Sequence, residues 1–370
     1  MNFPFTKKQK EIDYVLLSYF GVLLVFGLIM LASASAVIGY DRFGDQYFFI
    51  KRQLLYGAIP GVLAVFFLIK IPYTWIKKIT WFIAIGSFAL LVLVLIPGIG
   101  SSFNTGARSW ITFGGFSFQP AELAKLGVVF FLATYLAKLG KSVTELKTGF
   151  LPALCLGLVP VGLVILQPDI GTASILFVLV FGLLFVSGAK RSHLGVLALL
   201  AVAAFFVLIL IAPYRAARFT TFLHPELDPQ GIGYHINQAY LAIGSGGWFG
   251  KGLGHSVQKF QYLPEVHADS IFAVMAEEMG FVVSLLLVVL LLAITIRCIR
   301  IAQAAPDNFG ILIVSGIVIW FITQSFFNIG AMLGLMPITG VPLPFVSHGG
   351  TALVISLIGV GVVLNVSKQR

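Results

Sequence analysis

Four ionisable side chains lie inside long apolar stretches of this sequence: Glu122 and Lys125 in one stretch, and Glu277 and Glu278 in another. Ionisable groups at membrane depth are costly and are usually functional. Glu122 and Lys125 are three residues apart, so in a helix they share a face and can pair. Two interpretations stay open. The two residues form an internal ion pair that neutralises itself, or they line a polar cavity that opens outward, where Lys125 meets an anionic ligand group.

Asp269 begins the apolar stretch that contains the two adjacent glutamates. A carboxylate at a helix N-terminus is stabilised by the helix dipole, which favours its ionised form. A plain N-cap is the alternative role. Glu277 follows about 12 Å further along a helix axis and within roughly 80° of the same face. We therefore expect Asp269 and Glu277 to line one cavity, with Asp269 at its outer mouth, and we expect Glu278 to pack against a neighbouring helix.

Cations and an aromatic side chain occupy the polar segments next to these stretches. Guanidinium and ammonium groups bind phosphate oxygens, and together with an aromatic face they suit a phosphorylated, sugar-bearing amphiphile. The alternative is that they anchor the chain in the headgroup layer, which Trp and Arg both favour. The candidate substrate-binding residues are Arg108, Trp110, Arg215, Arg218, Lys259 and Glu265, in addition to Glu122, Lys125 and Glu277.

The composition indicates which kind of secondary structure positions these residues. Of the 370 residues, 59% are hydrophobic and 10% are charged, whereas a soluble domain carries about a quarter charged residues. This shortage excludes an ordinary cytosolic enzyme, a nucleic-acid-binding domain and a disordered scaffold, despite a net charge of +10. The apolar runs are long and do not alternate, so we predict an all-α polytopic membrane protein and not an outer-membrane barrel.

Ten apolar segments are each about long enough to cross a hydrocarbon core near 30 Å thick. We therefore predict ten transmembrane helices in one integral membrane domain over residues 1–370, with a long extracytoplasmic loop at 214–268 between helices 7 and 8. The predicted spans are 15–37, 51–69, 79–97, 119–137, 149–166, 170–187, 194–213, 269–297, 308–333 and 351–366.

The basic residues fix the predicted orientation. Most of the 24 Lys and Arg residues fall in the short loops on the side of the N-terminus, so both termini are expected to be cytoplasmic. The segments 98–118, 214–268 and 334–350 then face outward, and function is expected there. Residues 32–36 resemble a signal-peptidase site, but the apolar stretch before them is longer than a usual signal sequence, so we expect the first span to be retained.

Two further motifs carry little chemistry. The glycine-rich segment 244–252 has Gly252 where a phosphate-binding loop needs Ser or Thr, so we interpret it as a flexible turn between short surface helices. His267 is two residues from both Glu265 and Asp269, which is weak evidence for a divalent cation. We therefore predict no metal site with assigned ligands, and a divalent cation such as Mg²⁺ or Mn²⁺ only as an optional cofactor. Cys155 and Cys298 lie far apart, and no disulfide is expected.

Several blocks in a fixed order make the whole chain resemble the SEDS family (shape, elongation, division and sporulation), which contains FtsW- and RodA-type proteins. Residues 258–265 look more like the FtsW type than the RodA type. His348, where an aromatic such as Tyr is expected, and Ala268, where Thr is usual, depart from the family pattern. The blocks that carry the resemblance are 118–125 (FQPAELAK), 167–173 (QPDIGTA), 244–247 (GSGG), 258–280 and 342–350 (PLPFVSHGG).

The resemblance implies a peptidoglycan glycosyltransferase that polymerises lipid II into glycan strands on the outer face of the cytoplasmic membrane, during septal wall synthesis in cell division. It implies that Asp269 is the essential acidic residue, and that Glu122 and Lys125 are a cavity pair. Asp269 then serves as general base for the acceptor hydroxyl. Cations, with or without a metal ion, stabilise the departing undecaprenyl pyrophosphate that carries the strand. The implied partners are a class B penicillin-binding protein, which cross-links the strand, and divisome regulators.

Three alternatives stay open. A lipid II flippase fits the intramembrane charges and the number of spans, but the cytoplasmic loops are short and lack comparable acidic residues. A RodA-like polymerase would serve elongation in place of division. A scaffold that recruits division proteins predicts that removing the charge of Asp269 has no effect. The sequence does not identify the cognate transpeptidase, the metal requirement or the glycan length.

Overall fold

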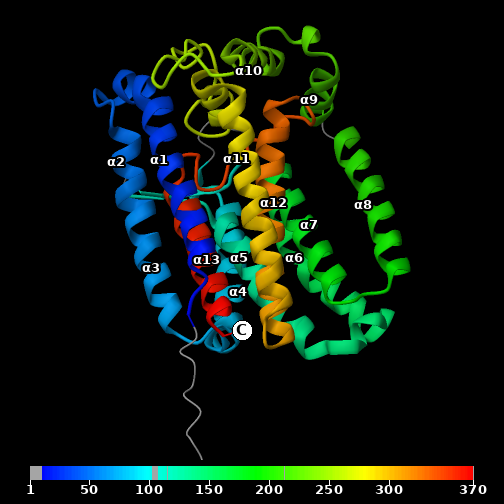
Figure 1. Cartoon of the computed structure of the whole chain (residues 1–370). Helices are drawn as coiled ribbons and strands as arrows, with labels where there is room; N and C mark the ends of the chain where they lie inside the picture. Colours follow the sequence, from blue (N-terminus) through cyan, green and yellow to red (C-terminus); the bar gives the residue numbers. More distant parts are fainter. Residues whose placement is uncertain (1–10, 102–106, 115, 212, 370) are drawn as a thin grey trace, which may run out of the picture.

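The computed structural model describes residues 11–101, 107–114, 116–211 and 213–369. These residues form a helical bundle with one small sheet (Figure 1). In chain order the elements are α1 (Tyr14–Phe43), α2 (Phe48–Gln53), η1 (Leu54–Ala58), α3 (Ile59–Lys70), α4 (Thr74–Leu95), β1 (Gly100–Ser101), β2 (Trp110–Phe113), β3 (Phe116–Phe118), α5 (Pro120–Leu139), η2 (Gly140–Thr144), η3 (Leu146–Phe150), α6 (Leu151–Leu166), α7 (Ile170–Val186), α8 (Arg191–Ile211), α9 (Pro213–Leu223), η4 (Pro225–Leu227), α10 (Ile232–Gly246), α11 (Ile271–Gln303), α12 (Asn308–Met332) and α13 (Gly350–Lys368).

Short polar side chains begin several of the long helices. Asp13, Asp169 and Asp307 are the N-caps of α1, α7 and α12, and each carboxylate accepts a hydrogen bond from a backbone N–H in the first turn. These bonds satisfy donors that a helix start leaves without intrahelical partners. Pro120 occupies the first position of α5, where its missing N–H costs nothing. The polar break at 167–169 therefore ends α6 and starts α7, as the sequence predicts.

Nine helical segments of the described chain are long and apolar enough to cross a membrane. The one predicted span that is missing from these nine is the sixth, 170–187. It corresponds to α7, which is apolar but has only 17 residues. The all-α polytopic fold is therefore confirmed, whereas the count of ten stays a prediction. Boundaries agree within a few residues, except that α1 continues to Phe43 and α11 to Gln303. In α1 Leu16, Leu23 and Met30 are fully buried, so the first span is part of the bundle.

The bundle has a buried centre and lipid-facing flanks. The helices α5, α12 and α13 are the most buried, and α8 is the least buried. Exposed apolar side chains on the flanks suit contact with lipid hydrocarbon. The backbone of these helices can also lie in lipid, because its polar groups bond to one another within the helix. Helix α1 begins and α13 ends at the same end of the bundle, and α9 and α10 lie across the opposite end (Figure 1). This arrangement agrees with predicted termini on one side and a long loop on the other.

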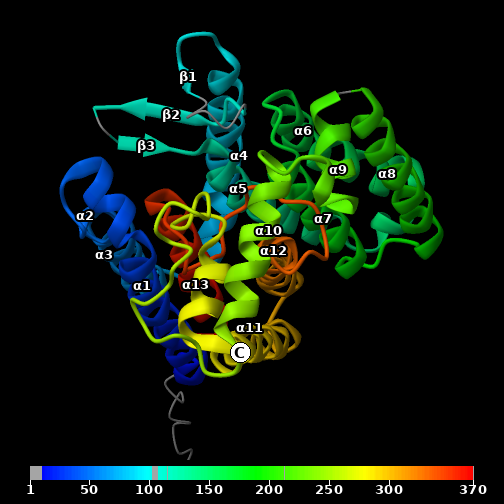
Figure 2. The ribbon, with the colours of Figure 1, turned by 90° about the horizontal axis from the view of Figure 1, so that it is seen from above.

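The segment 98–118 contains secondary structure that the sequence did not predict. The strands β1, β2 and β3 form an antiparallel sheet in this order, with Ile111 opposite Gly100 and Phe118. The sheet extends to one side of the bundle near α4 and α5 (Figure 2). It ends directly before Pro120, and so it fixes the entry of the chain into α5.

Candidate active site

Asp269 lies in the turn before α11, beside a narrow pocket at the end of the bundle that carries α10. The side chain is 8% exposed. Polar and small residues line this pocket with it, among them Asn328, Thr339 and Gly340, together with Ala331 and Met332. The space between these side chains does not admit even a water-sized sphere, whereas typical small-molecule sites have roughly 300–1,000 Å³. The pocket as seen therefore does not hold a sugar ring.

The protonation of Asp269 differs from the sequence-based expectation. The N-cap of α11 is Ser270, and α11 begins at Ile271, so Asp269 is not the helix cap. Burial, followed by the nearby Glu265 carboxylate, raises the pKa of Asp269 to about 7, against the smaller lowering effects of the Ser270 hydroxyl and the Arg218 guanidinium. Asp269 is therefore not kept fully ionised as expected, because a carboxyl with this pKa is about half protonated at pH 7. A carboxyl with this pKa exchanges protons near neutral pH.

Ser270 connects Asp269 to a histidine of α10. The Ser270 Oγ lies 3.4 Å from Asp269 Oδ1 and donates to it, and His235 Nε2 lies 2.6 Å from the same Oγ. Burial lowers the pKa of His235 to about 4, so the ring is neutral at pH 7. A neutral ring that carries its proton on Nε2 donates to the Ser270 oxygen and leaves the hydroxyl proton for Asp269.

Two amides of α12 hold the backbone around the pocket. Asn328 Nδ2 donates to Asp269 O at 2.7 Å and to Val341 O at 2.8 Å. Gln324, one helical turn earlier, donates through Nε2 to Pro342 O at 2.9 Å. Residues four apart on a helix share a face, so this face of α12 fixes the segment 340–342 against Asp269.

The Glu122–Lys125 pair is connected to the Asp269 pocket through Gln324 of α12. Lys125 Nζ lies 2.8 Å from Glu122 Oε1 and 2.6 Å from Gln324 Oε1, and it sits 5.1 Å from the centre of the Trp320 ring. The two side chains are 2% and 1% exposed. The predicted ion pair is confirmed, whereas the alternative role, in a cavity that opens outward, stays a prediction. Glu122 Oε2 is buried without a hydrogen-bond partner among the described residues.

Glu277 does not line a cavity with Asp269. Its side chain is fully buried, and Lys251 Nζ and Ser256 Oγ donate to it at 2.7 Å and 2.5 Å. The helical-face argument fails for two physical reasons: Asp269 precedes the helix, and the segment 251–258 folds over Glu277. The geometry assigns this carboxylate a structural role in place of the predicted substrate-binding one.

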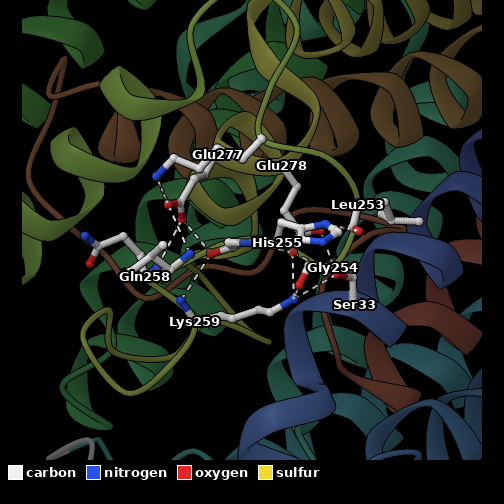
Figure 3. A network of polar contacts seen from close by, with 11 residues as sticks. Ser33, Leu253, Gly254, His255, Gln258, Lys259, Glu277 and Glu278 are labelled. Atoms are coloured by element: carbon white, nitrogen blue, oxygen red, sulfur yellow. Dashed lines mark hydrogen bonds and ion pairs between the residues drawn. The ribbon is translucent and has the colours of Figure 1, made fainter.

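Lys259 is likewise committed to a structural contact. Its Nζ lies 2.8 Å from Glu278 Oε1, with side-chain exposures of 4% and 0%, so it is not available to a pyrophosphate. Glu278 also accepts a hydrogen bond from Ser33 Oγ of α1. The expectation that Glu278 packs against a neighbouring helix is therefore confirmed (Figure 3).

The remaining predicted binding residues lie in the segments 98–118 and 214–268. Arg218 of α9 and Glu265 are exposed, and both act electrostatically on Asp269. Arg108 is exposed, and Trp110 is half-buried at the start of β2. The Arg215 side chain lies outside the described part of the structure. Arg218 and Glu265 thus join the Asp269 site, whereas the sheet carries Arg108 and Trp110 as a separate group.

The two departures from the family pattern meet next to Asp269. His348 N donates to His267 O at 2.8 Å, and Ser347 Oγ donates to Ala268 O. Burial lowers the pKa of His267 to about 4 and that of His348 to about 3. Smaller lowering effects come from Arg42 on His267, and from His267 and Arg52 on His348. His267 Nε2 lies 4.0 Å from Glu265 Oε2. Among the described residues, no group of three His, Cys, Asp or Glu side chains is placed to hold a metal ion.

The sequence did not single out His235, Ser270, Gln324 or Asn328 as site residues. Gln324 and Asn328 had a usable signal, because both are polar and one helical turn apart in a predicted span. His235 had none, since only the fold brings α10 to the start of α11.

Comparisons with known proteins agree on one family. Residues 14–370 match the family model described as "Cell cycle protein", which covers FtsW, RodA and SpoVE. The chain is 44% identical over 367 residues to stage V sporulation protein E of Bacillus subtilis (strain 168), covering 98% of this chain and 99% of that protein. It is 39% identical over 363 residues to the probable peptidoglycan glycosyltransferase FtsW of Geobacter sp. (strain M18), covering 98% of each.

Solved structures give the same result. A chain from a study of the structural coordination of polymerization and crosslinking by a peptidoglycan synthase complex matches with a TM-score of 0.80 and 31% identity, over 97% of this chain and 98% of that one. The rod shape determining protein RodA of Thermus thermophilus matches with a TM-score of 0.69 and 29% identity, over 97% of each. The fold, the sequence blocks and these matches lead to one conclusion: the chain belongs to the FtsW/RodA/SpoVE family of multi-pass membrane proteins.

Proposed function

We propose that this protein is a peptidoglycan glycosyltransferase that polymerises lipid II at the outer face of the cytoplasmic membrane. The observation that carries the proposal is the Asp269 carboxyl, whose pKa is raised to about 7, in a chain related over 98% of its length to proteins named peptidoglycan glycosyltransferase. A general base works best when its pKa lies near the operating pH. Asp269 meets this condition.

The proposed step transfers a glycosyl group. Asp269, in its ionised form, accepts the proton of an acceptor sugar hydroxyl as that oxygen attacks the anomeric carbon of the donor. The bond between the anomeric carbon and the pyrophosphate oxygen breaks, and the lipid pyrophosphate leaves with the electron pair. The donor is already activated, so no nucleotide is needed outside the cell.

Exposed cations are suited to the departing pyrophosphate. Arg218 acts electrostatically on Asp269, and it is the first candidate to stabilise negative charge that develops on the leaving group. Arg215 and Arg108 are further candidates on the outer segments. Lys125 and Lys259 are withdrawn from this set, because each is buried in an ion pair.

The reaction requires the site to open. The Asp269 carboxyl is mostly buried in the observed conformation, and the segment that covers it contains Gly334 and Gly340, both with positive φ. Glycine tolerates such backbone angles and changes of angle at low steric cost. We therefore propose that movement of residues 334–341 admits the acceptor hydroxyl, and that closure excludes water during transfer.

Septal wall synthesis is the proposed setting. It rests on residues 258–265 and on the FtsW-named relatives, with sporulation as the setting of the SpoVE relative. A class B penicillin-binding protein is the proposed partner, since the matching solved chain comes from a complex that polymerises and cross-links. A divalent cation has no ligand cluster among the described residues, and no step depends on one.

Purified parent and Asp269→Asn protein supplied with lipid II test the proposal. We expect size-separated products to contain glycan strands for the parent, and strand formation to fall by about 10²–10⁴-fold for the variant, the usual contribution of a general base. The variant should elute and melt as a folded protein. Strands formed by the variant at the parental rate would contradict the assignment. A parent that only moves lipid II across vesicles would indicate a flippase instead.

A further inference from the structure

Helix α11 is interrupted at Gly280, which has φ 73° and ψ −176°. The interruption divides it into a short half over 271–279, here called the half-helix, and the long span that follows. The segment 247–252 fits into the break and supplies the backbone partners that the helix loses. The four hydrogen bonds run from Lys251 N to Glu277 O (3.0 Å), Gly252 N to Glu278 O (2.9 Å), Phe281 N to Gly247 O (2.9 Å) and Val282 N to Trp248 O (3.1 Å).

Three glycines at this break, Gly246, Gly250 and Gly280, are explained by close backbone approach. A Cβ added to Gly246 would lie 2.0 Å from Ala276 O, one added to Gly250 would lie 2.2 Å from Glu278 O, and one added to Gly280 would lie 2.3 Å from Gly250 N. No side chain fits at such distances. The sequence-based interpretation of 244–252 as a flexible turn is therefore wrong, because this segment is packed against the half-helix.

Two buried carboxylates at the end of the half-helix hold residues 251–259, which precede it in the chain (Figure 3). Glu277 accepts hydrogen bonds from Ser256 Oγ and from Val257 N and Gln258 N, in addition to its bond with Lys251 Nζ. Glu278 accepts from Ser256 N at 3.3 Å, and it pairs with Lys259 Nζ and with Ser33 Oγ of α1. Lys259 Nζ also donates to Gly254 O at 2.8 Å.

These contacts close residues 250–280 into one unit. Its ends meet where Gly250 contacts Gly280, and its interior is fixed by the two carboxylates. Asp269 lies within this unit, between the segment that the glutamates hold and the half-helix that carries them. Asn328 of α12 holds Asp269 directly, through the Asp269 backbone oxygen. The contacts of Glu277, Glu278 and Lys259 hold Asp269 indirectly, through the rest of the unit.

We propose that Glu277, Glu278 and Lys259 are positioning residues, which hold Asp269 in its buried, proton-accepting place through the half-helix. The inference deepens the proposed function and rests on it. The Glu278–Lys259 pair is the most suitable target for substitution, because both side chains are buried and form an ion pair. Removing one partner of a buried pair leaves an uncompensated charge, whereas removing both together is often tolerated.

The experiment compares Glu278→Gln, Lys259→Met, the double variant and Lys259→Arg in strand synthesis from lipid II. We expect each of the first two to lower kcat about tenfold or more, with KM changed less than about twofold, because the loss concerns the reacting geometry and not substrate binding. The double variant should recover most of the parental kcat, and Lys259→Arg should retain it.

The pH profile separates positioning from simple loss of folded protein. Burial is the main cause of the raised pKa of Asp269. A loosened unit admits water, so that pKa falls toward its ordinary value and the acid limb of kcat/KM moves to lower pH. The charged groups that face Asp269, namely Glu265 and Arg218, and His235 acting through Ser270, are unchanged in all four variants. A merely structural defect lowers the amount of active protein and leaves the limb in place.

Arg297→Met is the matched control. It breaks the ion pair between Arg297 Nε and Asp13 Oδ2 (2.9 Å), at the other end of α11, and should lower the melting temperature without moving the acid limb. Single variants with parental kcat and profile, or a double variant as impaired as the singles, would overturn the inference. If the single variants do not fold, the double variant is compared with the parent alone. Recovery of most of the parental kcat supports the inference, and a strongly lowered kcat overturns it. If the parent forms no strands, the proposed function fails. If the parent forms strands but the variants do not follow the expected pattern, only the inference fails.

Discussion

His235 and Ser270, 35 residues apart in the chain, meet beside the Asp269 carboxyl, with 2.6 Å between His235 Nε2 and Ser270 Oγ. With the His235 proton on Nε2, the hydroxyl proton of Ser270 is directed to Asp269 Oδ1 at 3.4 Å. The helix α10, which carries His235, lies in the long outer segment. This segment therefore contributes directly to the electrostatics of the proposed base.

Replacing His235 tests this arrangement. In His235→Phe the Ser270 hydroxyl loses the donor that orients it, so its lowering effect on the Asp269 pKa weakens and that pKa rises. The acid limb of kcat/KM should move to higher pH by up to about one unit, which corresponds to about 1.4 kcal/mol. His235→Gln keeps an N–H donor and should stay near the parental profile. Equal profiles for Phe, Gln and parent would remove His235 from the site.

Glu265→Gln should move the same limb in the opposite direction. The Glu265 carboxylate raises the pKa of Asp269, so removing its charge lowers that pKa and extends activity to lower pH. Glu226→Gln is the control, because Glu226 is 70% exposed on η4 and pairs with His224. A limb that moves equally in both variants would point to a general charge effect and not to a neighbour of Asp269.

Asp269→Asn should stabilise the folded protein at high pH. Because the folded-state pKa is raised from 3.8 to about 7, the parent loses stability as the pH rises through this range, up to about 4 kcal/mol for three pKa units. The amide has no such loss. The variant should therefore melt above the parent at pH 8, and the difference should shrink toward pH 4. A difference that is independent of pH would argue against a buried, protonated Asp269.

Lys125→Met should destabilise the protein by about 3–5 kcal/mol, because it leaves Glu122 buried without its cation. The double variant with Glu122→Gln should recover much of this loss. Melting temperatures of the three proteins measure both effects. Unchanged melting combined with lost strand synthesis would instead support the cavity interpretation of this pair.

Hydropathy predicted the helices well, because the requirement for internally bonded backbone in lipid acts locally along the chain. Hydropathy also identified the ionisable residues inside the apolar stretches. In the structure Glu122, Lys125, Glu277 and Glu278 are all buried and in ion pairs. What local patterns do not contain is the identity of distant partners. Glu277 is held by residues about 20 positions earlier, and Glu278 by Ser33 of the first helix.

The errors at Asp269 have the same origin. A regular helix from 269 would have placed Asp269 and Glu277 on one face, but the chain is non-helical before Ile271 and is broken again at Gly280. The environment of Asp269 comes from α10, α12 and the segment 340–342, which only the folded chain brings together. The sequence therefore predicted the residue but not its pKa.

The dependence of strand synthesis on pH tests the role of Asp269 most directly. We expect kcat/KM of the purified parent, with lipid II as substrate, to rise with pH and to be half-maximal near pH 7, the pKa of Asp269. The residual rate of Asp269→Asn should lack this limb. A parental rate that is flat between about pH 5 and 8, or an Asn variant that keeps the limb, would contradict the assignment of Asp269 as general base.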